Sequence, residues 1–135
     1  METSMDYDGY IKTYNQGDDA ETAQRYYTED FALILPFGEL RGRDTVIDFL
    51  TKNHLGIPEE LRPRIVARTE GHILVELDIV LRPERDVPDH FLTPLVSGRE
   101  VTIRFFASYD LRGDRIAAMR LAWWPVADDQ QAPAA

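Results

Sequence analysis

Residues 72–81 read HILVELDIVL and residues 101–111 read VTIRFFASYDL, and these two stretches decide the fold. Their odd-numbered residues are apolar or aromatic: Ile73, Val75, Leu77, Ile79 and Leu81 in the first, and Ile103, Phe105, Ala107, Tyr109 and Leu111 in the second. A period of two places alternate side chains on one face of a β-strand. The sequence therefore predicts two long strands, each with one face in a core.

Further strands are expected on either side of these two. A modest strand over 65–69 is joined to 72–81 by the turn signal Glu70-Gly71, which indicates a hairpin. After residue 111, Arg112-Gly113-Asp114 predicts a turn into a last strand over 116–124. Residues 82–98 contain three prolines and many charges, so we expect a long loop there, and loops of that length are often functional.

The N-terminal third has helical spacing instead. Tyr7, Tyr10, Ile11 and Tyr14 form one amphipathic stripe, which ends at Gly17. A second helix is expected to begin at the capping residue Asp18 and to carry an apolar stripe that ends with Tyr26 and Tyr27. Residues 31–35 form a short apolar run that ends at Pro36, typical of a buried strand. A third helix, capped by Asp44, is predicted to fade before Gly56.

Helices followed by meandering strands predict an α+β domain in which three N-terminal helices cover one face of a curved antiparallel sheet. With 135 residues and 44% hydrophobic residues, the chain has the size and composition of one globular domain. We expect that domain to span residues 1–127 and residues 128–135 to be a disordered tail.

Charge and composition exclude several classes of function. The net charge of −9 opposes binding to nucleic acid or to an anionic membrane, so neither is an expected partner. The absence of cysteine excludes disulfides and thiolate catalysis, and His54, His72 and His90 lack the spacing of a metal site. No apolar run is long enough to span a bilayer and the N-terminus has no signal pattern, so a cytoplasmic protein is expected.

Several motifs occur in the order found in one known superfamily: YIKTYNQGD over 10–18, the elbow Pro36-Phe37-Gly38, LRGRD over 40–44 and Gly98-Arg99 before two long strands. From about Tyr7 to Trp124 the chain resembles the nuclear transport factor 2-like superfamily, and within it the SnoaL-like and ketosteroid isomerase branch. The resemblance implies a cone-shaped fold, with a curved sheet and helices enclosing a hydrophobic pocket, often in a homodimer.

The catalytic acids of those relatives do not carry over. At the positions that the resemblance assigns to the isomerase base, to its second acid and to the aspartate of cyclases and epoxide hydrolases, this chain has Leu35, Ala107 and Leu121. Only the tyrosine of the first helix is retained, as Tyr10. Any catalysis would therefore need an acid or base at another position.

Glu76 and Asp78 are the clearest candidates for a relocated acid/base pair. The alternative is structural, because their apolar neighbours have the opposite parity and face the core. Glu76 and Asp78 would then form cross-strand ion pairs with Arg104 and Arg120 on the other sheet face. His90 in the long loop could close over a pocket and exchange protons, or it could simply be solvated. His54, near the end of the third helix, is expected to face its terminal carbonyls.

The aromatic residues suggest a cavity lining or, equally, a filled core. The residues predicted to contact a ligand are Tyr14, Leu35, Phe37, Phe105, Ala107, Tyr109, Met119, Leu121 and Trp123. Trp124 has the other parity and is a candidate for a dimer contact.

Two hypotheses follow. The first is a small, cofactor-independent acid/base enzyme of the polyketide cyclase, isomerase, dehydratase or epoxide hydrolase type, acting on a hydrophobic small molecule. Tyr10, Asp78, Glu76 and His90 would be its catalytic residues. The alternative is a non-catalytic domain of the same fold that binds a hydrophobic ligand or dimerises, which the apolar residues at the family's acid positions favour.

Overall fold

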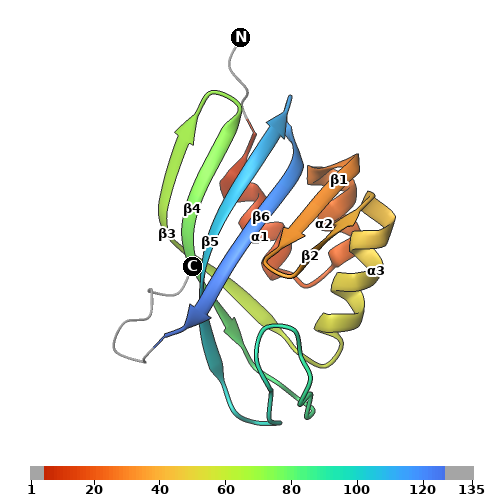
Figure 1. The fold of residues 1–135 in the computed structure, drawn as a ribbon, viewed down its shortest axis with the longest axis vertical. Helices are drawn as coiled ribbons and strands as arrows, with labels where there is room; N and C mark the ends of the chain where they lie inside the picture. The colour runs from red at the N-terminus through yellow and green to blue at the C-terminus, as the bar shows by residue number, and fades with distance from the viewer. Residues whose placement is uncertain (1–4, 127–135) are drawn as a thin grey trace.

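The computed structural model describes residues 5–126 as three helices and a single six-stranded sheet (Figure 1). The predicted tail over 128–135 and the ends of the predicted domain lie outside the described residues. The elements are α1 (Tyr7–Asn15), α2 (Asp19–Tyr26), β1 (Tyr27–Leu35), β2 (Gly38–Arg41), α3 (Arg43–His54), β3 (Glu59–Thr69), β4 (His72–Leu81), β5 (Val101–Arg112) and β6 (Arg115–Pro125).

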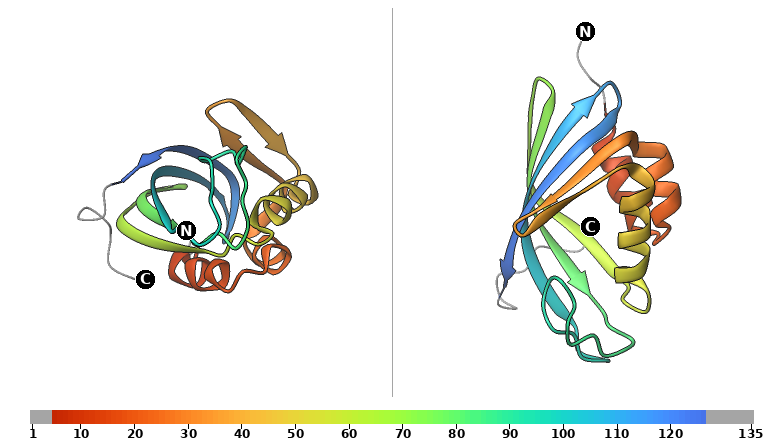
Figure 2. Two further views of the ribbon diagram at one scale, coloured as in Figure 1. Left: turned by 90° about the horizontal axis from the view of Figure 1, so that it is seen from below. Right: turned by 45° about the vertical axis from the view of Figure 1, so that its right-hand side comes forward.

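The strand order is β2-β1-β6-β5-β4-β3, so β1 from the N-terminal half lies beside β6 from the end of the chain. This pairing is parallel and the other neighbours are antiparallel. The sheet curls, and the three helices cover its inner face (Figure 2). The predicted α+β class is confirmed, with one parallel pair that the meander interpretation did not include.

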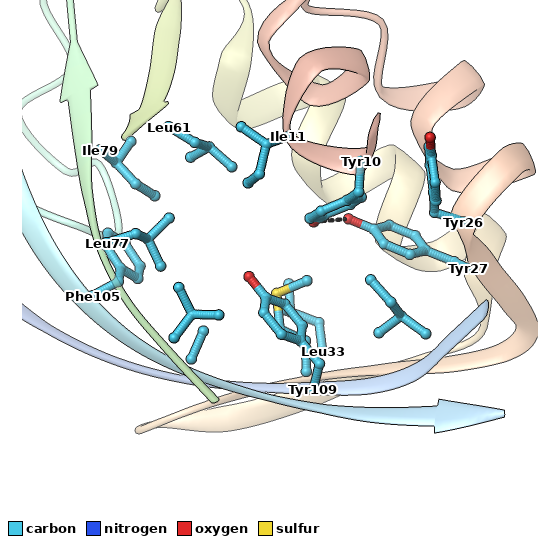
Figure 3. Packing of buried hydrophobic residues seen from close by; sticks show 14 of the residues in the cluster. Tyr10, Ile11, Tyr26, Tyr27, Leu33, Leu61, Leu77, Ile79, Phe105 and Tyr109 are labelled. Atoms are coloured by element: carbon cyan, nitrogen blue, oxygen red, sulfur yellow. Dashed lines mark hydrogen bonds between the residues drawn. The ribbon is translucent and has the colours of Figure 1, made fainter. Parts of the chain in front are cut away.

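Burial follows the predicted alternation. Ile73 and Val75 on β4 are buried in the core. So are Leu77 on β4 and Phe105 and Tyr109 on β5, which Figure 3 shows packed together with side chains of the helices. Burial of apolar side chains of this size stabilises the fold by about 1.5–3 kcal/mol each. The inner face of the long strands is therefore the core face.

Several boundaries differ from the prediction. The second helix ends at Tyr26, and Tyr27 is already the first residue of β1. The short strand β2 was not predicted, and β3 starts at Glu59 rather than at residue 65. The N-cap of α3 is Gly42, whose backbone φ of 95° suits glycine, and Asp44 lies in the first turn without capping it.

The predicted end of the first helix and the predicted start of the second agree with the structure. Gly17 has a φ of 86°, a left-handed conformation that ends a helix at little cost for glycine. The side chain of Asp18 accepts a hydrogen bond of 2.9 Å from the backbone N–H of Glu21, as its capping position predicted. This tight link between α1 and α2 fixes the position of Asp19, which matters for the site below.

Among residues 5–126, no helix has the length and apolarity needed to span a bilayer.

Candidate active site

A narrow cavity lies between the helices and the inner face of the sheet. Its walls are mainly apolar side chains from β1, α3, β4, β5, β6 and the loop over 82–100: Phe31, Leu33, Leu35, Val46, Leu50, Ile79, Phe91, Leu92, Phe105, Met119 and Leu121. The space open to the centre of a water molecule is about 50 Å³, enough for a few waters. The cavity therefore suits only a small ligand.

The polar side chains of the cavity wall are Tyr10, Tyr14, Tyr27, His54 and Glu59. Three of them belong to one hydrogen-bonded cluster that also includes Asp19. The Nδ1 atom of His54 lies 2.8 Å from Oδ1 of Asp19, and its Nε2 atom lies 3.2 Å from Oε1 of Glu59. The Tyr14 hydroxyl donates to the same oxygen of Glu59. We call these four residues the acid/base cluster.

The acid/base cluster joins four elements: α1, the start of α2, the end of α3 and the start of β3. His54 follows Val46 and Leu50 at intervals of four residues, so all three side chains lie on the inner face of α3. The side chains of His54, Asp19 and Glu59 are only 16%, 11% and 8% exposed. Charged groups are rarely so buried unless they are paired, as they are here.

The charges in the acid/base cluster stabilise one another. Burial alone would lower the pKa of His54, but the carboxylates of Glu59 and Asp19 outweigh burial and raise that pKa to about 10. Burial would likewise raise the pKa of Glu59, yet the charge of His54 and the hydrogen bonds from His54 and Tyr14 lower it. At neutral pH the cluster therefore holds an imidazolium between two carboxylates.

Tyr10 and Tyr27 form a second polar pair on the cavity wall. Their hydroxyl oxygens are 2.9 Å apart, as the dashed line in Figure 3 shows. Burial is the main reason why the pKa of Tyr10 lies well above its ordinary value, so its hydroxyl keeps its proton. Each hydroxyl has one hydrogen, and the hydrogen bond within the pair uses only one of these two hydrogens. The remaining hydrogen can be donated to an oxygen atom of a ligand.

The predicted catalytic residues Glu76 and Asp78 are not among the residues that line this cavity. Asp78 is fully buried and accepts two hydrogen bonds from Arg104, at 2.8 and 3.2 Å, as the ion-pair interpretation expected. Glu76 pairs with Arg64 rather than Arg120, whose partner is Asp110. Both carboxylates belong to the outer sheet face.

His90 lies behind the cavity wall. Its Nε2 atom donates to the backbone carbonyl of Asn53 at 3.2 Å, and its Nδ1 atom accepts from the backbone N–H of Leu92 at 3.2 Å. Burial lowers the pKa of His90, consistent with this neutral form. The predicted capping role of His54 is wrong, because His54 belongs to the acid/base cluster. His90 is the histidine that contacts a carbonyl in the last turn of α3.

The predicted ligand contacts divide into two groups. Tyr14, Leu35, Phe105, Met119 and Leu121 lie on the cavity wall, as does the predicted catalytic residue Tyr10, whereas Phe37, Ala107, Tyr109 and Trp123 do not. Tyr109 is buried beside the cavity, and its hydroxyl bonds that of Tyr7 at 3.2 Å. Trp123 supports the wall from behind, with its ring 5.3 Å from that of Phe105 and 5.9 Å from that of Phe91. Phe37 is 65% exposed.

Among residues 5–126, no group of three or more metal-ligating side chains is arranged to hold a metal ion. The side chains of the cavity wall supply a carboxylate, an imidazolium and tyrosine hydroxyls in an apolar chamber.

A cone-shaped α+β domain with a ligand-sized chamber under its helices defines a broad class of small-molecule proteins. Residues 7–119 match the model of the SnoaL-like domain, so this chain belongs to the SnoaL-like family. No curated protein matches it significantly.

Solved structures with the same fold are distant in sequence. IdmH from Streptomyces antibioticus, a candidate polyketide cyclase, has a TM-score of 0.70 at 16% identity, over 87% of this chain and 88% of IdmH. An epoxide hydrolase of M. tuberculosis resembling limonene epoxide hydrolase has a TM-score of 0.68 at 13% identity, over 87% and 79%. A ketosteroid isomerase-like protein from Catenulispora acidiphila, solved with trimethylamine, has a TM-score of 0.66 at 9% identity, over 84% and 80%.

Proposed function

We propose that this protein is a cofactor-independent acid/base enzyme that transfers protons on a hydrophobic small molecule in the cavity. The observation that carries the proposal is the acid/base cluster, in which ionised side chains are buried at the wall of an apolar cavity. The reaction types of the structural neighbours, polyketide cyclisation and epoxide hydrolysis, are both reactions that general acids and bases catalyse.

Glu59 is the proposed general base. Its Oε1 atom accepts hydrogen bonds from Tyr14 and approaches His54, whereas Oε2 has no hydrogen-bond partner among the described residues. A carboxylate oxygen at an apolar cavity wall, free of hydrogen bonds, can accept a proton from a substrate C–H or from a water molecule. This role replaces the acids of the family, whose positions hold Leu35, Ala107 and Leu121.

His54 is the proposed general acid, and Asp19 holds it in place. Both ring nitrogens of His54 point to carboxylates, so the ring carries two protons, and it can pass the proton on Nε2 to Oε1 of Glu59 as Glu59 returns a proton to the substrate. The free hydrogen of the Tyr10–Tyr27 pair would bind a substrate oxygen as charge develops on it. Proton removal, proton return and oxygen binding are then all supplied from one cavity wall.

The test follows proton transfer directly. Hydrophobic ketones, epoxides and alcohols are incubated with the protein in heavy water, and products and deuterium uptake are followed by mass spectrometry. We expect Glu59→Gln to slow turnover by about 10²- to 10⁴-fold, the usual contribution of a general base. The matched control is Glu60→Gln, the same change at the next residue of β3, where the side chain pairs with Arg62 and Arg82.

A purely structural role for the acid/base cluster would give a different result. Glu59→Gln would then lower the melting temperature but leave the rate constant of the folded protein unchanged. Absence of turnover across the panel would instead favour the alternative function, a non-catalytic domain that binds a hydrophobic ligand.

We also propose that the protein is a homodimer, joined through an outer apolar patch of Ile65, Leu74, Phe106 and Trp124. These side chains are 58%, 47%, 48% and 41% exposed on the sheet face away from the helices. The rings of Phe106 and Trp124 pack edge to face, with centroids 4.8 Å apart. Apolar side chains gathered on one face are typical of a protein interface.

A further inference from the structure

The polar end of the cavity carries an excess of negative charge. His54 approaches Asp19 through one ring nitrogen and Glu59 through the other, at 2.8 and 3.2 Å. A histidine can donate from both nitrogens only as an imidazolium. Two carboxylates and one imidazolium leave a net charge of −1 in the acid/base cluster.

Nothing else on the cavity wall balances this charge. Among the described residues that line the cavity, none is lysine or arginine. His90, behind the wall, is neutral because its Nδ1 accepts a hydrogen bond. A negative charge in surroundings of low polarity attracts a cation and repels an anion more strongly than it would in water.

The unshared charge has a defined position. Tyr14 and His54 both interact with Oε1 of Glu59, which leaves Oε2 without a hydrogen-bond partner among residues 5–126. The side chain of Glu59 is only 8% exposed, so this oxygen lies at a site that is largely shielded from bulk water. A ligand N–H that donates to Oε2 would complete the coordination of the carboxylate.

Aromatic faces surround the same end of the cavity. Tyr10, Tyr14 and Tyr27 lie on the wall, and the ring of Phe31 stacks on that of Tyr27 at 4.0 Å. The electron-rich faces of such rings attract ammonium groups within about 6 Å. Ionic and aromatic contacts thus favour the same kind of ligand.

A hollow on the protein surface adjoins the same residues. Tyr14, His54 and Glu59 line it together with Gly17, Gly56 and Glu84. Glu84 adds a second carboxylate to this hollow, and the Arg85 side chain lies against Gly56, so the hollow has both acidic and basic neighbours and the preference for a cation comes from the cavity itself.

We propose that the cavity recognises a hydrophobic ammonium ion, whose nitrogen binds Oε2 of Glu59 among the tyrosine rings while its apolar body lies against Leu33, Phe105 and Met119. The inference uses the same cavity and the same atom, Oε2 of Glu59, as the proposed function, and an ammonium N–H bound there occupies the point at which a substrate proton would be removed. It adds the charge of the ligand, which the proton-transfer chemistry by itself leaves open.

The test compares three small aromatic ligands of similar size and different charge. Benzylamine, which is protonated at neutral pH, benzyl alcohol and benzoate are titrated into the full ¹⁵N-labelled chain, and dissociation constants are taken from amide shifts. We expect benzylamine to bind at least about fivefold more tightly than benzyl alcohol, and benzoate to bind most weakly. Shifts should centre on Tyr14, His54 and Glu59.

The wild-type series decides the question even if a variant does not fold. If benzylamine binds no better than the alcohol, or if none of the three ligands binds, the inference is wrong. In Glu59→Gln the preference for the amine should fall to less than about twofold, while Glu60→Gln, with the same change in net charge, should keep it. If Glu59→Gln keeps the preference for benzylamine, Oε2 of Glu59 is not the atom that binds the ammonium group.

The two proposals fail separately. Turnover that depends on Glu59 but shows no preference for amines overturns the ligand class and leaves the proton-transfer proposal standing. A strong amine preference without any turnover overturns the enzyme and retains the cation site.

Discussion

The Nε2 atom of His54 lies 3.2 Å from Oε1 of Glu59, and this contact joins the end of α3 to the start of β3 inside the protein. It brings together two residues on either side of a Gly-Ile-Pro turn, so that a local feature of the chain supplies two of the four residues of the acid/base cluster.

The first prediction concerns the pH dependence of stability. The pKa of His54 is raised from an ordinary 6.5 to about 10 in the folded protein. Its stabilising effect is therefore complete below about pH 6.5 and is lost as the pH rises through about 10. Denaturant unfolding should show that the wild type loses more free energy of unfolding over this range than His54→Asn does. The control His72→Asn, at an exposed histidine, should behave like the wild type.

The second prediction concerns the ion pair on the outer sheet face. Asp78 is fully buried and Arg104 is 11% exposed, so removing the charge of Asp78 takes away the buried carboxylate to which this guanidinium donates two hydrogen bonds. Asp78→Asn should lower the free energy of unfolding by about 3 kcal/mol. Asp30→Asn, in an exposed pair with Arg112, should cause no measurable change.

The same variant separates the two sets of acids. Because Asp78 does not line the cavity, the folded fraction of Asp78→Asn should turn over any substrate at the wild-type rate. A large loss of rate in this variant would restore Asp78 as a catalytic candidate.

The third prediction concerns the loop over 82–100. The neutral ring of His90 accepts a hydrogen bond from the backbone N–H of Leu92, which lies on the cavity wall. Since the folded pKa of His90 is lowered, its contribution to stability is lost as the pH falls below its ordinary value of 6.5. Glu59, His54 and Arg85 are the charged groups that act on this ring.

Hydrogen exchange at Leu92 should report this change. After correction for intrinsic rates, protection of the Leu92 amide should fall in acid in the wild type and should be low at every pH in His90→Ala. Equal protection in the two proteins would mean that His90 does not hold the loop.

The fourth prediction concerns the oligomeric state. Phe106→Lys places a charge in the outer apolar patch and should convert a dimer into a monomer in sedimentation velocity experiments. Leu55→Lys, at a 68% exposed leucine after α3, should leave the dimer intact. A wild type that sediments as a monomer at high concentration would disprove the dimer.

The long strands were predictable because each has an apolar side chain at every second position. This spacing is typical of a strand that has one face in the core. Strand β3 was harder to predict. Its first half contains Glu59, Glu60, Arg62 and Pro63, and the register shifts between Pro63 and Ile65, so no single parity runs through it. Pro63 is tolerated because β3 is an edge strand.

The acid/base cluster was missed for the same reason. Glu59 and Leu61 share the inward parity, but the strand was expected to begin six residues later. His54 did give a signal, because it continues the stripe of Val46 and Leu50. Its partner Asp19, at the start of α2, could be found only once the helices were packed, since nothing in local spacing relates residues 35 positions apart.

The parallel pairing of β1 with β6 has a consequence for synthesis. Leu33 lies opposite Leu40 of β2 on one side and Met119 of β6 on the other, so β1 gains its second neighbour only after more than eighty further residues have left the ribosome. Until then β1 and the three helices have been synthesised, but most of the sheet that the helices cover is missing. Such long-range closure slows folding and exposes apolar segments to aggregation, so this chain should depend on chaperones more than a protein with only local contacts.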